Sequence, residues 1–154
     1  MKKFLLCALI GFIGGVAIMH VVSAQEKGIA IVAHRGYWNC EASGSAKNSI
    51  AALKQAQELG VWGSEFDVNM SLDGQLLVFH DNSVEGERIE KHPASDFDYY
   101  RLKNGESIPN IDQFLEQAKK SPKTMLVYEL KKHSCDSVET HAVEASSAKL
   151  KEHG

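Results

Sequence analysis

Short apolar runs that each end in charged or titratable residues recur along this 154-residue chain, and they constrain its fold more than any other feature. The first run covers residues 28–33 and is followed directly by His34 and Arg35. A continuous apolar run of this length is typical of a strand that is buried on both faces of a parallel sheet. His34 is therefore expected at the carboxyl end of a strand, which is where the sites of α/β proteins lie.

Helices and strands are predicted to alternate after this first strand. Asn48 or Ser49 is expected to cap a helix that ends at Gly60, and Asn110 is expected to cap another that ends before Pro122. The remaining predicted elements are strands over 61–68, 76–80 and 124–130, and a weaker helix over 138–150. This order favours the α/β class.

The turn residues Asp73 and Gly74 predict a hairpin, because the connection between 61–68 and 76–80 is too short for a helical crossover. If both residues lie at the centre of the turn, His80 pairs directly with Asp67. Glu65 and Asp67 are two positions apart on one strand and so share a face. The predicted register therefore brings the second histidine to a pair of carboxylates.

Residues 82–107 are polar and irregular in pattern, apart from an aromatic cluster at Phe97, Tyr99 and Tyr100. We expect this segment to be an insertion that roofs the site.

Residues 1–24 are predicted to be a secretory signal peptide, since Lys2 and Lys3 precede an apolar stretch that ends in Ser23 and Ala24. An uncleaved membrane anchor is the alternative, because the stretch approaches the roughly 20 residues that span a bilayer. The small-residue exit favours cleavage. We therefore expect a periplasmic or secreted mature chain over 25–154, with no stable membrane span.

Cleavage removes two of the 17 basic residues and none of the 20 acidic ones, so 15 basic residues remain and the formal charge changes from -3 to -5. A mildly acidic chain is a poor nucleic-acid binder. No nucleic-acid partner is expected. Cys40 and Cys135 would meet an oxidising compartment. The two cysteines could form a disulfide or remain two unpaired thiols. Unpaired thiols are favoured, because sequence alone does not establish the geometry that a disulfide needs.

The residues that end the apolar runs suit phosphodiester hydrolysis, which needs charge neutralisation at the phosphate oxygens and a transfer of protons. Arg35 and Lys131 offer cations to a phosphate. Histidine is the side chain most suited to proton transfer near neutral pH, so His34 and His80 are candidates to share the acid and base roles.

Three carboxylates complete this set, namely Glu65, Asp67 and Glu129. Carboxylate oxygens are preferred ligands of Mg²⁺ and Ca²⁺, so the three are candidates to hold one divalent ion against the phosphate. Each residue type alone is more often structural: a lone histidine after a strand, a solvated acidic face, or a Glu-x-Lys ion pair of little energetic weight. Their joint occurrence at strand ends favours a site.

In this order the motifs resemble those of the glycerophosphodiester phosphodiesterase family. They are His34-Arg35-Gly36, Asn48-Ser49, Glu65-x-Asp67-Val68, Asp73-Gly74, His80-Asp81 and Glu129-x-Lys131. The resemblance implies a TIM-type (β/α) barrel with an insertion after the His-Asp motif, a divalent metal, and hydrolysis of glycerophosphodiesters to glycerol 3-phosphate and an alcohol in glycerophospholipid metabolism. It assigns catalysis to His34 and His80, phosphate binding to Arg35 and Lys131, and the metal to the three carboxylates.

Two departures from the family pattern bear on function. Where many members carry Pro-Glu before the Asn, this chain has Ala46-Lys47, which replaces a carboxylate near the site by a lysine. A TIM barrel also takes about 250 residues, so we expect only its N-terminal part here. An unclosed sheet would leave a bare edge on 124–130, through which the chain is expected to self-associate.

Two alternatives to hydrolysis remain open at this point. One is a catalytically inactive half-barrel that acts as a binding or assembly module. The other is a lyase-type phospholipase that forms a cyclic phosphate, since the same histidines and metal serve that chemistry. The sequence decides neither the alcohol part of the substrate nor Mg²⁺ against Ca²⁺.

Overall fold

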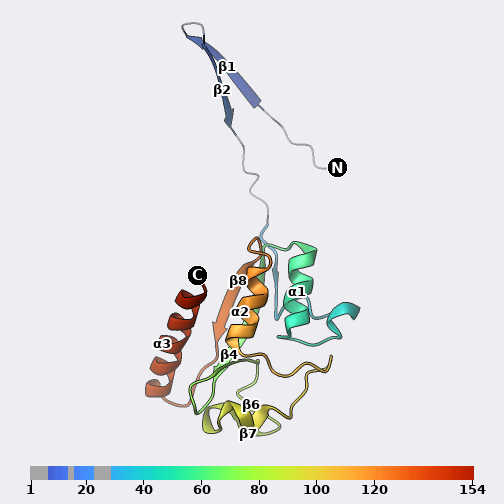
Figure 1. Ribbon diagram of the computed structural model, residues 1–154, viewed down its shortest axis with the longest axis vertical. Coiled ribbons are helices and arrows are strands. Elements are labelled where there is room, and N and C mark those ends of the chain that lie inside the picture. Colours follow the sequence, from blue (N-terminus) through green and yellow to red (C-terminus); the bar gives the residue numbers. More distant parts are fainter. Residues whose placement is uncertain (1–6, 14–15, 23–28) are drawn as a thin grey trace.

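The computed structural model describes residues 7–13, 16–22 and 29–154 of the chain (Figure 1). In its N-terminal part, β1 (Cys7–Ile13) and β2 (Val16–Val22) pair as antiparallel strands. The predicted cleavage site after Ala24 lies outside the described residues, and the signal peptide stays a prediction. Within the described part, no helix has both the length and the apolar character needed to cross a bilayer.

A mixed four-stranded sheet carries the rest of the fold, and β4 (Gly63–Met70) is its central strand. The strands β3 (Val32–Ala33) and β8 (Met125–Leu130) run parallel to β4. The short strand β5 (Leu76–Val78) is antiparallel to the end of β4. The predicted α/β class is therefore confirmed.

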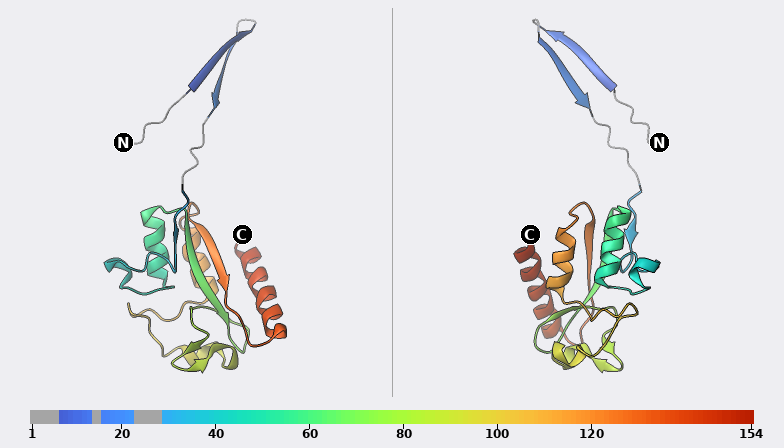
Figure 2. Two further views of the ribbon diagram at one scale, coloured as in Figure 1. Left: turned by 180° about the vertical axis from the view of Figure 1, so that it is seen from behind. Right: turned by 45° about the vertical axis from the view of Figure 1, so that its right-hand side comes forward.

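Three helices pack against this sheet, in the order α1 (Ile50–Leu59), α2 (Ile111–Lys119) and α3 (Asp136–His153) (Figures 1 and 2). Their predicted boundaries follow from local caps. The Ser49 hydroxyl accepts a hydrogen bond from the Ala52 amide at the start of α1. Gly60 ends that helix at a φ of 71°, in the left-handed region.

The second helix begins with a capping box, as the Asn110 and Gln113 spacing predicts. The Asn110 side chain accepts from the Gln113 amide, and the Gln113 side chain accepts in return from the Asn110 amide. The third helix is longer than expected, because it begins at Asp136 and runs to His153.

The hydrophobic core lies between the helices and one face of the sheet. Phe66, Val68 and Met70 alternate along β4 and are all buried in this core. The ring of Phe66 stacks on Phe114 of α2 with 4.5 Å between centroids. Because strand side chains alternate, Glu65 and Asp67 point to the opposite face. The strand thus separates the packing face from a polar face.

The prediction that residues 28–33 form a strand buried on both faces is wrong. Only Val32 and Ala33 pair with β4, and the Ile29 side chain is 94% exposed. Ile31 and Val32 are also exposed. The physical reason is that β3 is an edge strand, which among the described residues pairs with β4 alone.

The hairpin forms as predicted, but its register is shifted by one residue. Val68 pairs with Val78 and Met70 with Leu76, so His80 is not opposite Asp67. The Ser71 amide donates to the Gln75 carbonyl at 2.9 Å, which leaves three residues in the loop rather than two. Asp73 is the middle residue of this loop, and its carboxylate accepts from the Ser71 hydroxyl.

The segment after His80 is more ordered than its sequence pattern indicates. It contains an antiparallel pair, β6 (Ser83–Val84) with β7 (Glu87–Arg88), and the short 3-10 helices η2 (Ile89–Lys91) and η3 (Ala94–Phe97). A second small core orders it, formed by Ala46, Leu77, Val84, Ile89, Phe97, Leu102 and Ile108. A further 3-10 helix, η1 (Glu41–Ser43), lies in the loop before α1.

Candidate active site

A sharp bend after β3 positions the first predicted motif. Arg35 and Gly36 both have positive φ angles, of 60° and 76°. The Arg35 amide donates to Oε2 of Glu65 at 2.7 Å, and the Gly36 amide lies 3.2 Å from the carbonyl oxygens of Ala33 and Glu65. The backbone amides of the bend therefore hold it against β4 by hydrogen bonds.

The three predicted metal ligands converge on the polar face of the sheet. Asp67 of β4 pairs directly with Glu129 of β8 in the parallel register. One carboxylate oxygen from each of Glu65, Asp67 and Glu129 lies within 4.8 Å of the others. The structure thus brings these residues together as expected, while their role as metal ligands remains a prediction.

Asp67 is the most enclosed group of the site, with its side chain 1% exposed. Its Oδ2 accepts from the Asn48 amide at 2.9 Å and lies 3.4 Å from Nε of Arg35. Its Oδ1 accepts from Nζ of Lys131 at 3.2 Å. Two cations and an amide therefore compensate this buried carboxylate.

Lys131 bridges two of the carboxylates. Its Nζ lies 2.6 Å from Oε1 of Glu129 in addition to its contact with Asp67. Partial burial alone would lower the pKa of Lys131, but the hydrogen bonds to Glu129 and Asp67 outweigh it and raise the pKa. Lys131 is therefore a cation in the site.

Glu65 carries the strongest indication of a missing partner. Its Oε1 is buried and has no hydrogen-bond partner among the described residues. Burial raises the pKa of Glu65 above its ordinary value of 4.5, and the charges of Asp67 and Glu129 raise it further, against the lowering effect of the Arg35 amide and His34. An orphaned buried oxygen beside two further carboxylates fits a hard divalent cation.

The two predicted catalytic histidines differ in their surroundings. Nε2 of His34 lies 3.8 Å from Oε2 of Glu65, and its side chain is 68% exposed. Nδ1 of His80 is 2.6 Å from Oδ1 of Asp81. His80 shares a hollow with Arg35 rather than contacting the carboxylates. Tyr100 also lines this hollow, which supports the expectation that the segment 82–107 covers part of the site.

Asn48 is a site residue, although from the sequence it is only a cap candidate and part of the family pattern, without a role in the site. Ser49 is the cap, whereas Asn48 has a φ of 58° and turns its side chain onto Asp67. Asparagine tolerates the left-handed region better than most residues. An Asn directly before a helix cap was the available signal.

A substitution of Glu65 by Gln is expected to stabilise the metal-free chain by about 1 kcal/mol. It removes a buried negative charge that is repelled by the charges of Asp67 and Glu129. A raised pKa means that folding favours the protonated carboxyl. The gain is therefore present above the pKa of Glu65 and shrinks as the pH falls through it.

Urea unfolding in a chelator, at several pH values, measures this gain. The matched control is Glu58→Gln on α1, whose side chain is exposed and pairs with Lys54. An E65Q chain that is less stable than the wild type at neutral pH would contradict the repulsion argument.

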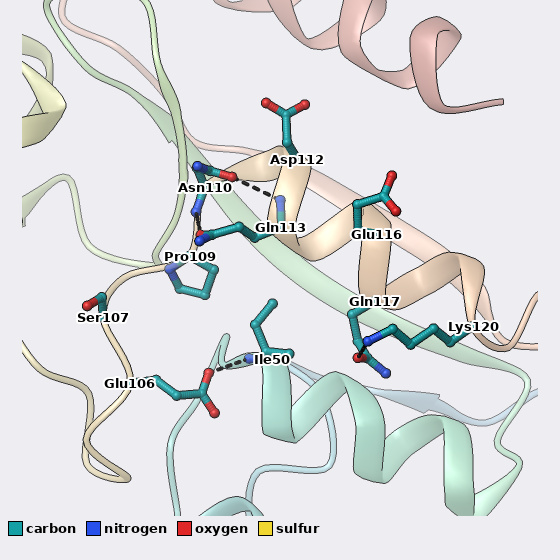
Figure 3. A pocket seen from close by; sticks show the side chains of 10 residues that line it. All are labelled: Ile50, Glu106, Ser107, Pro109, Asn110, Asp112, Gln113, Glu116, Gln117 and Lys120. Atoms are coloured by element: carbon teal, nitrogen blue, oxygen red, sulfur yellow. Dashed lines mark hydrogen bonds between the residues drawn. The ribbon is translucent and has the colours of Figure 1, made fainter.

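A larger hollow lies between α1 and α2 (Figure 3). None of the predicted site residues lines it. Its polar groups complete helix ends: Glu106 accepts from the Ile50 amide, and Asn110 accepts from the Gln113 amide. A separate group of Asp112, Glu152 and His153 also brings three side chains within 4.8 Å, but none of these three residues is buried, whereas Glu65 and Asp67 are.

Cys40 and Cys135 are both free thiols in the described part of the chain. Cys40 lies in the loop before α1, where its Sγ is 3.2 Å from the Ser43 hydroxyl. Cys135 is exposed at the start of α3, and a hydrogen bond with Ser137 lowers its pKa.

Comparisons with known proteins point to one family. The model of the Glycerophosphoryl diester phosphodiesterase family matches residues 34–148. A glycerophosphodiester phosphodiesterase of Caldanaerobacter subterraneus subsp. tengcongensis is 33% identical over 98 residues, which are 56% of this chain and 39% of that protein. One of Bacillus altitudinis is 29% identical over 113 residues, covering 66% and 44%. The chain spans less than half the length of these curated relatives.

Solved structures agree with this result. The crystal structure of a glycerophosphodiester phosphodiesterase from Parabacteroides distasonis has a TM-score of 0.76 and 40% identity, covering 79% of this chain and 50% of that one. An Oleispira antarctica phosphodiesterase, solved in complex with the product sn-glycerol-3-phosphate, has a TM-score of 0.65 and 29% identity, covering 79% and 51%. These neighbours belong to a family with the TIM-barrel fold.

Proposed function

Because the chain belongs to the glycerophosphoryl diester phosphodiesterase family, we propose that it carries the metal-binding and phosphate-binding part of an enzyme that hydrolyses glycerophosphodiesters. The convergence of three carboxylates within 4.8 Å beside an arginine and a lysine is the observation that carries this proposal. Residues 29–154 would form the N-terminal part of a TIM-type barrel.

Glu65, Asp67 and Glu129 would hold one divalent ion, Mg²⁺ or Ca²⁺, through oxygen ligands. Such an ion supplies charge stabilisation to a phosphoryl oxygen and to the attacking group. The buried, unpartnered Oε1 of Glu65 supports this assignment. The Nε of Arg35 is buried and lies 3.4 Å from Oδ2 of Asp67, so the terminal nitrogens of the guanidinium would be the ones to meet a phosphate oxygen.

His34 and His80 would divide the proton transfers. The Asp81 carboxylate at 2.6 Å from Nδ1 orients the His80 ring and leaves Nε2 free to exchange a proton. His34 is exposed beside Glu65, so it can reach a substrate bound over the carboxylates. Water attack with protonation of the leaving alkoxide gives glycerol 3-phosphate and an alcohol.

The product bound by the Oleispira antarctica neighbour supports glycerol 3-phosphate as the product here. Lys2 and Lys3, which precede the apolar stretch within residues 1–24, support secretion. The reaction would then belong to glycerophospholipid metabolism and take place outside the cytoplasm.

Hydrolysis of glycerophosphoinositol by the full chain, with and without a chelator, tests the proposal. We expect activity to require Mg²⁺ or Ca²⁺, and His80→Ala to lower it about a hundredfold through the loss of a proton carrier. His141→Ala is the matched control, since His141 is exposed on α3 away from the site residues.

Activity that survives both the chelator and His80→Ala would refute the mechanism. Phosphorus NMR of the product separates hydrolysis from the lyase reaction, because only the lyase leaves a cyclic phosphate. A folded chain without activity on any glycerophosphodiester would favour a binding or assembly module instead.

A further inference from the structure

A hollow of about 450 Å³ adjoins the candidate active site. Arg35, Asn48 and His80 line it, so it shares a phosphate-binding candidate and a catalytic candidate with the site. Volumes of this order are typical of small-molecule sites. A substrate whose phosphate lies against Arg35 would therefore extend one of its two organic groups into this hollow.

The hollow is positively charged. Lys47 and Lys103 line it together with Arg35, and both lysines are exposed. Among residues 29–154, neither lysine has a carboxylate within ion-pair distance, in contrast to Lys54, Lys119 and Lys149. Asp81 is the one acidic residue in the described lining, and it is engaged with His80.

Lys47 is held in place by an aromatic ring. Its Nζ lies 4.7 Å from the centroid of the Trp38 ring, within the range of a cation–π interaction. This contact fixes the Lys47 ammonium group at the edge of the hollow. A cationic alcohol such as choline would meet repulsion from Lys47 and Lys103, whereas the rings of Phe79 and Tyr100 line the hollow without adding charge.

We propose that this hollow binds the alcohol part of the substrate and selects alcohols that carry a further anionic group, such as a phosphorylated polyol. This inference rests on the proposed function and assigns the substrate class of the same site. The glycerol group of a glycerophosphodiester is neutral, so only the alcohol can supply the negative charge that Lys47 and Lys103 attract. Phosphate groups accept hydrogen bonds from lysine ammonium groups.

Two substrates that differ by a single phosphate give the first test. They are glycerophosphoinositol and glycerophosphoinositol with one further phosphate on its ring. For the full chain we expect kcat/KM to be about five to ten times higher for the phosphorylated substrate, from two partly solvated ion pairs. The double variant Lys47→Gln/Lys103→Gln should bring this ratio to about 1, and Lys47→Glu should lower it further.

Lys54→Gln is the matched control, because Lys54 is an exposed lysine on α1 that pairs with Glu58 outside the hollow. The ratio in this variant should equal that of the wild type. A wild-type ratio near 1, or a ratio that the double variant leaves unchanged, overturns the proposal.

Calorimetric binding separates a failure of this inference from a failure of the proposed function. We expect the full chain to bind inositol bisphosphate about five times more tightly than inositol monophosphate, and the double variant to bind both alike. This result in a chain without hydrolytic activity would uphold the subsite and reject the enzymatic proposal. If inorganic phosphate shows the same affinity and the same dependence on both lysines, the hollow is a free-anion site and the inference is wrong.

Discussion

Replacement of Gly36 by alanine is expected to destabilise the chain by about 4 kcal/mol, because it combines backbone strain with a collision. Gly36 has a φ of +76°, which L side chains rarely adopt. A Cβ at this position would lie 2.7 Å from both the backbone carbon and the Cβ of Ala52 in α1. Neither atom is the end of a flexible side chain, so the bend or the helix must move.

Gly74→Ala provides a matched control for the strain alone. Gly74 has a φ of +77°, yet nothing lies within 4 Å of a Cβ built there. Its substitution should cost only about 1 kcal/mol. Urea unfolding of both variants measures the difference. Equal losses at the two positions would show that α1 accommodates the methyl group and that the close approach is unimportant.

Substitution of Asp67 by alanine is expected to cost about 3 kcal/mol of stability, since it breaks a buried ion pair, removes the carboxylate beside Arg35 and leaves Lys131 with Glu129 alone. Asp67 accepts from Asn48, lies beside Arg35 and accepts from Lys131. Arg35 and Lys131 are themselves only 17% exposed, so water replaces the lost carboxylate poorly. The free energy of unfolding in urea, in the presence of a chelator, gives the value without any contribution from metal.

Glu129→Ala is the comparison for Asp67, because the two residues are paired neighbours on adjacent strands. The Glu129 side chain is 53% exposed and shares its one ion pair with a lysine that Asp67 also contacts. We expect Glu129→Ala to lower the free energy of unfolding by well below about 1 kcal/mol, because an ion pair of an exposed side chain contributes little to stability. If Glu129→Ala proves as damaging as Asp67→Ala, burial is not what sets the size of the effect.

The features that sequence reasoning predicted correctly depend on local chemistry. Ser49 and Gly60 bound α1 because a hydroxyl cap and a left-handed stop act within one turn of the helix. Glu65 and Asp67 share a face because strand alternation is a property of the backbone. Their meeting with Glu129 needed only the expectation that strands 61–68 and 124–130 lie in one sheet.

The features that it missed depend on contacts between distant segments or on a single side chain. The hairpin register is set by the three-residue loop that Ser71 and Gln75 close, and both loop lengths are compatible with an Asp-Gly pair. The exposure of β3 depends on which strands flank it. The position of Asn48 before a helix suggests a cap, and its contact with Asp67 joins residues 19 positions apart, which no local pattern indicates.

The bend after β3 is attached to Glu65 by the amide of Arg35 and to the β4 backbone by the amide of Gly36. The Tyr37 amide also donates to the Ala52 carbonyl at 3.0 Å, so the position of His34 relative to the acidic groups depends on β4 and on α1 together. Mutations that loosen the packing of α3 should therefore shorten the lifetime of the native state without moving the bend, whereas mutations where α1 meets the bend should change both. Durability and turnover are thus traits that selection can alter separately at α3 but only jointly at α1.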